Sequence, residues 1–272
     1  MQRFQIVGIV LIKNEDMYIE RVIRNVVDFC DKIIITDHMS TDNTFEVCKK
    51  LSAEFPKIDL RVIEHPRESS YAISSYYGTN TWVFAVDGDE IYDPVGLRLL
   101  RNYILLGKFS YSWCVFGNVL NVIEIDAEKK IAKGYLAPPS RSVTKLYNFS
   151  IIENWLDCTN ERLHGGKIIF KEGYHSGLRR YLHEELDWDA SYFRCLHMAF
   201  LVRSSLDKDN MISTRLNPDE LQKIQSKNGF FRRKIEVLRM LLKQLFRADW
   251  KNQKYKRGSL SVKDVSIFFS SR

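Results

Sequence analysis

The feature that most constrains this chain is the regular alternation of strand-like apolar runs and helical patterns in its first 95 residues. The run at residues 5–12 (Gln-Ile-Val-Gly-Ile-Val-Leu-Ile) is continuous and rich in β-branched residues, as expected for a strand covered on both faces. The same reasoning predicts further strands at 32–36, 60–63 and 82–86, with helices at 16–30, 42–55 and 69–79. This alternation predicts a Rossmann-like α/β fold, a mostly parallel sheet with helices on both faces.

Polar residues follow three of these predicted strands at the point where each one ends. Residues 13–15 (Lys-Asn-Glu) follow the first strand, Asp37 the second, and Asp87-Gly88-Asp89 the fourth. In a parallel sheet the ligand lies outside the carboxyl ends of the strands. Two carboxylates separated by one small residue can reach a single divalent ion, and hard oxygen ligands suit Mg²⁺ or Mn²⁺. Taken alone, these three residues could simply form a turn, in which Asp and Gly are common. Their position directly after a buried strand favours a metal-binding site.

Composition excludes several classes of protein. The 272 residues are 45% hydrophobic and 28% charged, which excludes wholesale disorder. The five cysteines are widely spaced and contain no Cys-x-x-Cys pair, so a reducing cytoplasm is expected rather than a disulfide framework or zinc site. The apolar stretch at 4–12 is too short to span a bilayer and lacks a basic leader, so no signal peptide is expected.

The net charge of +7 is unevenly distributed. Residues 227–272 hold thirteen Lys/Arg and three Asp/Glu, a net of +10, and the remainder holds 28 basic and 31 acidic residues, a net of −3. Within the basic part, residues 230–246 form an amphipathic helical pattern. Two interpretations remain open for it: a helix on an anionic membrane surface, which we favour, or a helix packed on the body. Nucleic acid is not an expected partner, because no nucleic-acid motif accompanies the charge.

The three polar motifs, in this order, resemble those of the family 2 glycosyltransferases of the GT-A fold. Residues 33–44 (Ile-Ile-Ile-Thr-Asp-His-Met-Ser-Thr-Asp-Asn-Thr) resemble the family's strand, aspartate and Ser-x-Asp-x-Thr pattern, and Asp87-Gly88-Asp89 resembles its DxD motif. The resemblance covers about the first 95 residues. It implies a nucleotide-sugar donor, with a UDP-sugar preferred, and a divalent metal, Mn²⁺ or Mg²⁺, that bridges the donor's diphosphate.

The resemblance also implies roles for individual residues. Asp87 and Asp89 would bind the metal, and a late histidine would complete its shell. We assign that histidine to His197, in the segment 197–204, with His175 as the rival. The implied donor-binding residues are Ile12, Asn14, Glu15, Asp37, Arg67, Asp87 and Gly88, with Tyr71 as a weaker candidate beside Arg67.

Beyond residue 110 the match is looser, and the Glu-Asp pair that marks the catalytic base in many family members is not evident. An inverting transferase needs a carboxylate that takes the proton of the acceptor hydroxyl. Glu161, before a Gly-Gly turn, is the first candidate and Asp157 the second; an ordinary salt bridge is the alternative for Glu161. Arg141 and Lys145 are candidate second cations at the diphosphate or, equally, members of a solvated strand edge.

Together these observations predict a metal-assisted, inverting glycosyltransferase that acts on a hydroxyl of a cell-surface polysaccharide or glycolipid. We expect a cytoplasmic protein at the inner face of the membrane. The predicted parts are a nucleotide-sugar-binding half (1–95), an acceptor-binding half (96–210) and a basic, amphipathic helical tail (211–272). The alternatives are a glycan- or lipid-binding module without turnover and a sugar nucleotidyltransferase, although the latter's Gly-rich, Arg-containing loop is absent after the first strand.

Overall fold

The central sheet is mixed and mostly parallel, as the sequence predicts. The structure is a computed structural model that describes residues 4–142, 145–158, 165–207 and 250–270. The strands of this sheet are β1 (Gln5–Ile12), β2 (Lys32–Asp37), β3 (Ile58–Val62), β4 (Thr81–Asp87), β6 (Cys114–Phe116), β9 (Lys145–Asn148) and β12 (Arg179–Tyr181). Across the described ranges their order is β12-β6-β9-β4-β1-β2-β3. The strands β1 to β4 pair in parallel, whereas β9 runs antiparallel to β4 and β6.

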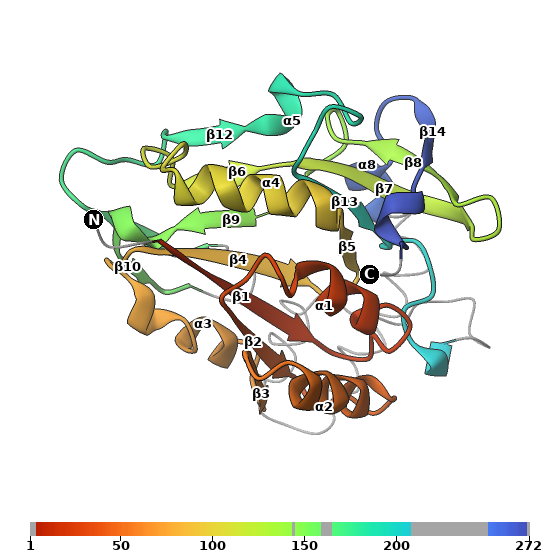
Figure 1. The fold of residues 1–272 in the computed structure, drawn as a ribbon, viewed down its shortest axis with the longest axis horizontal. Helices are drawn as coiled ribbons and strands as arrows, with labels where there is room; N and C mark the ends of the chain where they lie inside the picture. The colour runs from red at the N-terminus through yellow and green to blue at the C-terminus, as the bar shows by residue number, and fades with distance from the viewer. Residues whose placement is uncertain (1–3, 143–144, 159–164, 208–249, 271–272) are drawn as a thin grey trace, which may run out of the picture.

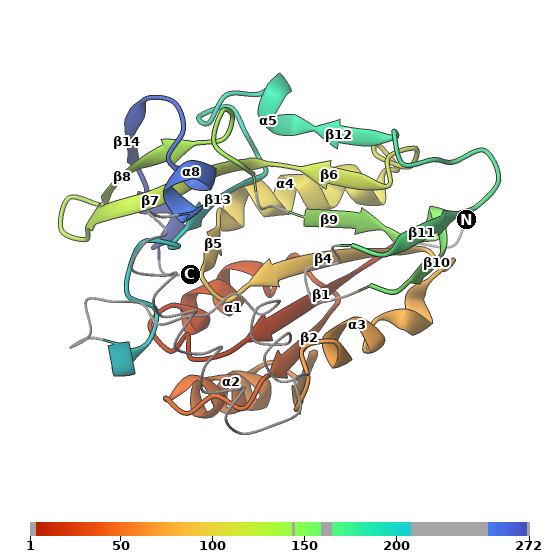
Figure 2. The same ribbon diagram turned by 180° about the vertical axis from the view of Figure 1, so that it is seen from behind.

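Apolar side chains project from both faces of this sheet, and other elements cover both faces. Ile6 and Val10 pack in one cluster with the helices α1 (Ile19–Val26), α2 (Thr44–Glu54) and α4 (Pro94–Leu105). Val7 and Ile9, which alternate with them, pack on the other face with Ile73 and with the hairpin β10 (Ile152–Leu156) and β11 (Lys167–Phe170). The short helix α3 (Glu68–Tyr71) lies near this second face. Figure 1 views the face that carries α1 and α4, and Figure 2 the opposite face.

A second sheet, of five strands in the described ranges, follows β4 in the chain. Its strands are β5 (Glu90–Tyr92), β7 (Asn118–Asp126), β8 (Ile131–Leu136), β13 (Arg194–His197) and β14 (Leu260–Asp264), in the order β14-β8-β7-β13-β5. The helices α5 (Leu182–Glu185) and α8 (Trp250–Tyr255) accompany it (Figure 1). The Asp87-Gly88-Asp89 turn therefore joins β4 of the first sheet to β5 of the second.

Two predicted elements differ from the structure. The apolar and aromatic pattern at 111–119 also predicts a single strand, but the structure divides this segment at Gly117 into β6 of the first sheet and β7 of the second. A Cβ atom at Gly117 would lie 2.2 Å from the Phe193 carbonyl oxygen. The predicted helical tail at 211–272 is only partly helical in its described portion, which contains β14 as well as α8 and buries Val265 and Phe268 completely. The predicted amphipathic helix at 230–246 lies outside the described residues.

No helix among the described ranges is long and apolar enough to cross a bilayer.

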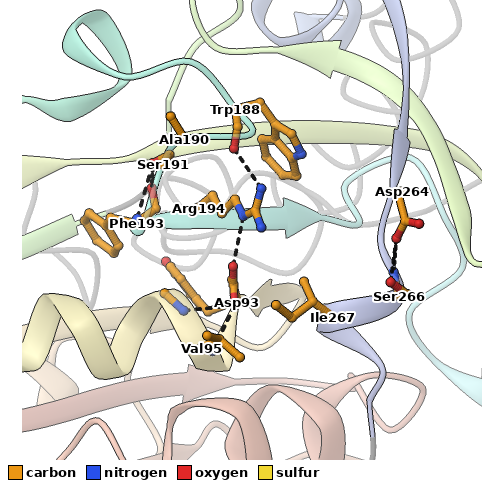
Figure 3. A network of polar contacts seen from close by, with 12 residues as sticks. Asp93, Val95, Trp188, Ala190, Ser191, Phe193, Arg194, Asp264, Ser266 and Ile267 are labelled. Carbon is orange, nitrogen blue, oxygen red and sulfur yellow. Dashed lines mark hydrogen bonds and ion pairs between the residues drawn. The ribbon is translucent and has the colours of Figure 1, made fainter.

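One buried network attaches helix α4 to the second sheet (Figure 3). Asp93 precedes α4, and one of its carboxylate oxygens accepts hydrogen bonds from the backbone N–H groups of Val95 (2.8 Å) and Gly96 (3.0 Å). The other accepts one from Arg194 Nε at 2.9 Å, and Arg194 also donates to the Trp188 carbonyl at 2.8 Å. The helix cap and strand β13 are therefore held by the same carboxylate.

Candidate active site

The predicted polar residues gather at one edge of the central sheet. In the parallel pairing of β1 with its neighbours, Ile12 lies opposite Asp37, and Leu11 lies opposite Asp87. The strands β1, β2 and β4 therefore end at the same level, and the segments that follow them meet there.

The segments that follow β1 and β2 are joined by hydrogen bonds. Asn14 adopts a left-handed backbone conformation (φ 54°), which asparagine tolerates better than most residues. Its backbone N–H donates to Ser40 Oγ at 3.0 Å, and its side-chain oxygen accepts from the Thr41 backbone N–H at 2.8 Å. The Ser40 N–H in turn donates to Asp37 at 3.0 Å. Asn14 and Asp37, predicted donor-binding residues, are thus brought together.

Asp37 has an acceptor that the described chain leaves without a hydrogen bond. The side chain is buried, and although one carboxylate oxygen accepts from Ser40, the other has no hydrogen-bond partner in the described part of the structure. A buried carboxylate oxygen without a donor is costly. An N–H group of a ligand would satisfy it.

A pocket of about 320 Å³ lies beside the end of β2. Its lining residues are Thr36, Arg61, Val62, Ile63, Glu68, Tyr71 and Ala72. Arg67, the residue predicted to contact the donor here, is not among them; it precedes α3, and its N–H donates to His65 Nδ1 at 3.3 Å. Tyr71, one helical turn later and 65% exposed, is among the lining residues.

Gly88 packs closely against the side chains of Glu15 and Ile12. A Cβ atom at this position would lie 2.0 Å from Glu15 Oε2 and 3.1 Å from the Ile12 side chain. Gly88 is an implied donor-binding residue, and the structure places the Glu15 carboxylate against it. The backbone of Glu15 is held at this point, because its N–H donates to Thr44 Oγ1 at 2.7 Å.

The carboxylate of Asp89 is buried between a guanidinium and an imidazole. Arg203 donates to Asp89 and also lies 3.5 Å from Glu15 Oε1, while His197 Nε2 lies 3.8 Å from Asp89 Oδ2. Arg203 reaches this position because its carbonyl accepts from the Met17 backbone N–H at 3.1 Å. Arg203 is the basic residue of the predicted histidine segment 197–204, but the sequence assigns it no role.

The orientation of His197 is set by Asn121. The side-chain N–H of Asn121 donates to the Tyr135 carbonyl at 3.2 Å, so its oxygen faces His197 Nδ1, 2.9 Å away. Nδ1 must therefore carry the proton, and in the neutral ring the lone pair of Nε2 is on the Asp89 side. A ligating histidine commonly has its second nitrogen held by such a hydrogen bond.

The rival histidine lies elsewhere. His175 is exposed and belongs to a turn that bonds to Trp113, whose N–H donates to the Leu178 carbonyl and whose indole donates to the Ser176 carbonyl. Trp113 precedes β6, which runs parallel to β4, so this turn is near the amino edge of the sheet. His197, not His175, lies beside Asp89.

Of the two candidate bases, Asp157 alone lies among the described residues. Glu161 lies outside the described residues. Asp157 follows β10 in a left-handed conformation (φ 52°), and the described structure gives its carboxylate no contact with Asp87 or Asp89. Of the two candidate second cations, Lys145 is buried with its Nζ atom 3.9 Å from Asp87 Oδ1, whereas Arg141 is exposed.

Glu90 is a further carboxylate that the sequence analysis missed. It is completely buried, and it accepts hydrogen bonds from the Tyr92 hydroxyl (2.7 Å) and the Asp87 backbone N–H (3.3 Å). Burial raises the pKa of Glu90 well above its ordinary value, and the nearby Asp87 carboxylate raises it further.

The donor set suits a hard divalent cation. No group of three or more His, Cys, Asp or Glu side chains is already arranged around one point in the described ranges. Mg²⁺ and Mn²⁺ need fewer protein ligands than that, because they keep waters and substrate phosphates. Asp87, Asp89 and the oriented Nε2 of His197 fit this requirement, and the surrounding carboxylates outnumber the two cations Lys145 and Arg203.

Comparison with known proteins identifies the family of this chain. The sequence profile of the family described as Glycosyl transferase family 2 matches residues 9–187. The chain belongs to this family. The predicted resemblance to the family 2 glycosyltransferases is therefore confirmed. The predicted α/β fold with a mostly parallel central sheet is confirmed as well.

This family 2 glycosyltransferase has curated relatives over part of its length. It is 28% identical over 85 residues to the SPbeta prophage-derived glycosyltransferase SunS of Bacillus subtilis, covering 30% of this chain and 19% of the relative. It is 33% identical over 81 residues to the uncharacterized glycosyltransferase RT0209 of Rickettsia typhi, covering 30% of this chain and 26% of the relative. The matched stretch is thus only about a fifth to a quarter of these relatives' length.

Two solved structures are also similar. S. aureus TarS in complex with UDP is 15% identical, with a TM-score of 0.38, and the match covers 54% of this chain and 47% of that chain. Glucosyl-3-phosphoglycerate synthase from Mycobacterium tuberculosis, in complex with Mn²⁺ and UDP-glucose, is 19% identical with a TM-score of 0.30, covering 44% and 43%.

Glu90 leads to a prediction about stability and pH. Because its pKa is raised in the folded state, folded Glu90 keeps a proton that the unfolded chain releases, so stability falls as pH rises above about 5. Glu90→Gln is neutral at every pH, and its amide oxygen can keep both accepted hydrogen bonds. In metal-free buffer we expect its melting temperature to exceed that of the wild type by at least about 2 °C at pH 8 and to converge with it near pH 4.5.

The control for this prediction is Glu124→Gln, since the Glu124 side chain is 69% exposed. We expect its melting curve to follow the wild type across the pH range. The opposite result would be a Glu90→Gln protein that melts below the wild type at pH 8 but not at pH 4.5. It would show that the Glu90 charge stabilises the fold.

Proposed function

We propose that this chain transfers a sugar from a nucleotide-sugar donor, with a UDP-sugar preferred, to a hydroxyl of a cell-surface polysaccharide or glycolipid. We further propose that the reaction uses Mn²⁺ or Mg²⁺ and inverts the anomeric centre. The observation that carries the proposal is the buried Asp89 carboxylate with the oriented Nε2 of His197 3.8 Å away, at the ends of the parallel strands.

The donor would lie across this edge of the sheet. The unsatisfied oxygen of Asp37 suits an N–H group of a nucleobase, and Tyr71 beside the end of β2 offers an aromatic face to the same base. The diphosphate would then lie toward Asp87 and Asp89. Uracil presents one N–H at its pairing edge, which is consistent with a UDP donor.

The bound metal would be held by Asp87, Asp89 and His197, and it would neutralise negative charge on the diphosphate. The chain's own cations act in the same direction. Lys145 and Arg203 lie beside Asp87 and Asp89, so both are placed to bind phosphate oxygens. These preorganised charges would stabilise the leaving group as its bond breaks.

The transfer step exchanges one bond for another. The bond between the anomeric carbon and the diphosphate oxygen breaks, and its electron pair leaves with the nucleoside diphosphate. The acceptor hydroxyl oxygen forms the new glycosidic bond from the opposite face, and its proton passes to a carboxylate. Glu161 and Asp157 stay our candidates for that base.

The first experiment is a calorimetric titration of UDP, GDP, CDP and ADP into the protein with and without Mn²⁺. We expect metal-dependent binding of one nucleotide, UDP, and weaker binding after Asp37→Asn. The matched control is Asp189→Asn, an aspartate whose exposed carboxylate pairs at the surface with Lys263. Binding of no nucleotide would overturn the proposed transferase, and nucleotide binding without sugar transfer or hydrolysis would favour a binding module.

Location and attachment are part of the proposal. The reducing environment indicated by the cysteines favours the cytoplasm. The basic, amphipathic residues 230–246 favour the inner face of a membrane, where a lipid-linked acceptor would be available.

A further inference from the structure

A basic pocket of about 510 Å³ lies between the loop that follows β8 and the chain around α8. Its lining residues are Pro139, Arg141, Gln253, Lys254 and Arg257. Three of these five side chains are positively charged, and none is negatively charged. The pocket therefore attracts anions.

The two walls of the pocket are fixed to each other. The hydroxyl of Ser140, which is 4% exposed, donates to the Tyr255 carbonyl at 2.7 Å and accepts from the Arg257 backbone N–H at 3.1 Å. The Arg141 N–H donates to the Lys254 carbonyl at 3.2 Å. Gly258, in a left-handed conformation (φ 79°), lies so close to the proline wall that a Cβ atom would be 2.7 Å from the Pro139 ring. The backbone positions of Arg141, Lys254 and Arg257 are thus held relative to one another.

The pocket adjoins the candidate active site through both walls. Tyr255, next to Lys254, is buried, and its ring packs edge-on against the His197 ring with 5.0 Å between centroids. On the other wall, Arg141 lies four residues before Lys145 in the chain. The Lys145 ammonium lies 3.9 Å from Asp87 Oδ1. An anion in the pocket would therefore lie near the metal-binding residues, because Tyr255 contacts one of them, His197.

The diphosphate of the donor already has partners in the proposed function, namely Lys145, Arg203 and the metal. A second anion site near His197 therefore fits the other substrate. Guanidinium groups bind phosphate oxygens in pairs, and an ammonium adds a point charge.

We propose that this pocket binds a phosphate group of the acceptor, so that the acceptor of this transferase is a phosphate-bearing alcohol. The inference rests on the proposed function, because only a transferase has an acceptor. Phosphate binding by the pocket can be tested independently of that function. The group that the pocket would recognise is a phosphodiester or a phosphomonoester. It can come from a lipid headgroup or from a soluble or polymeric polyol phosphate.

The test uses the double variant Arg141→Gln/Arg257→Gln, which removes both guanidinium groups of the pocket. The matched control is Lys129→Gln/Lys133→Gln, which removes one charge from the turn between β7 and β8 and one from β8 itself. Three probes are titrated calorimetrically: glycerol 3-phosphate, glycerol, and UDP with Mn²⁺. Vesicles of phosphatidylglycerol and of phosphatidylcholine are tested by co-sedimentation.

We expect the wild type and the control to bind glycerol 3-phosphate but not glycerol, with affinity that falls as salt is added. The pocket variant should bind glycerol 3-phosphate at least about tenfold more weakly, with unchanged affinity for UDP and Mn²⁺. A parallel loss of binding to phosphatidylglycerol vesicles would assign the phosphate to a lipid, and unchanged vesicle binding would assign it to a non-lipid acceptor.

Equal affinity of the variant and the wild type for glycerol 3-phosphate would overturn the proposal. So would an equal loss of UDP affinity, because the pocket would then belong to the donor site. Failure of the wild type to bind any nucleotide would instead overturn the proposed function, while the glycerol 3-phosphate result would still decide whether the pocket binds phosphate.

Discussion

Asp89→Asn is expected to lower kcat/KM for sugar transfer by about 100- to 1,000-fold while the protein stays folded. A bound metal contributes several kcal/mol to the stabilisation of developing charge, and each 1.36 kcal/mol corresponds to a factor of ten in rate. Asparagine keeps the size of the side chain and can still accept the hydrogen bond from Arg203, but it lacks the charge that would hold the cation. Mn²⁺ affinity, measured by electron paramagnetic resonance, should fall together with the rate.

The matched control is Asp126→Asn at the end of β7. Its carboxylate accepts from the backbone N–H groups of Glu128 and Lys129 in an exposed turn, away from the active-site edge. We expect wild-type kinetics and Mn²⁺ affinity. If Asp89→Asn binds Mn²⁺ and turns over like the wild type, the cation site is not at this turn.

Asp93→Ala is expected to lower the free energy of unfolding by about 3–5 kcal/mol, since it leaves a buried charge without its partner. The Asp93 side chain is 3% exposed and that of Arg194 is 14% exposed, so water cannot replace the lost contact well. The change also removes the cap of α4, which by itself costs about 1 kcal/mol. Urea denaturation followed by circular dichroism measures the sum.

Two further variants separate these contributions. Asp189→Ala breaks the surface pair with Lys263, in which Asp189 is 74% exposed, and should cost less than about 1 kcal/mol. Asp93→Ala/Arg194→Met should be more stable than Asp93→Ala alone, because the uncompensated charge is gone. Equal costs for Asp93→Ala and Asp189→Ala would refute the buried-pair account.

The first half of the fold could be predicted because its signals are local. A strand such as β1, covered on both faces, reads as an uninterrupted apolar run, and the polar residues that follow such strands locate the site. The helix predicted at 16–30 is shorter in the structure, Ile19–Val26, because the residues before it form the turn in which the N–H groups of Tyr18 and Ile19 donate to the Glu15 carbonyl.

The second sheet could not be predicted, because its pairings join distant parts of the chain. Strand β5 pairs with β13, and β8 pairs with β14, with more than 100 residues between the partners in each case. For the same reason the site was only partly foreseen. Asp37, Asp87 and Asp89 follow recognisable strands, whereas Arg203 and Asn121 reach the site only through tertiary contacts.

The turn between the two sheets has a consequence for hydrogen exchange. Asp87 ends a strand of the first sheet, Glu90 begins a strand of the second, and the Met198 N–H donates to the Asp89 carbonyl at 2.9 Å. A cation held by Asp87 and Asp89 would make local opening of this junction cost its binding energy. The Met198 amide should then exchange with deuterated solvent more slowly as the Mn²⁺ concentration rises, and so report on occupancy of the site without any substrate.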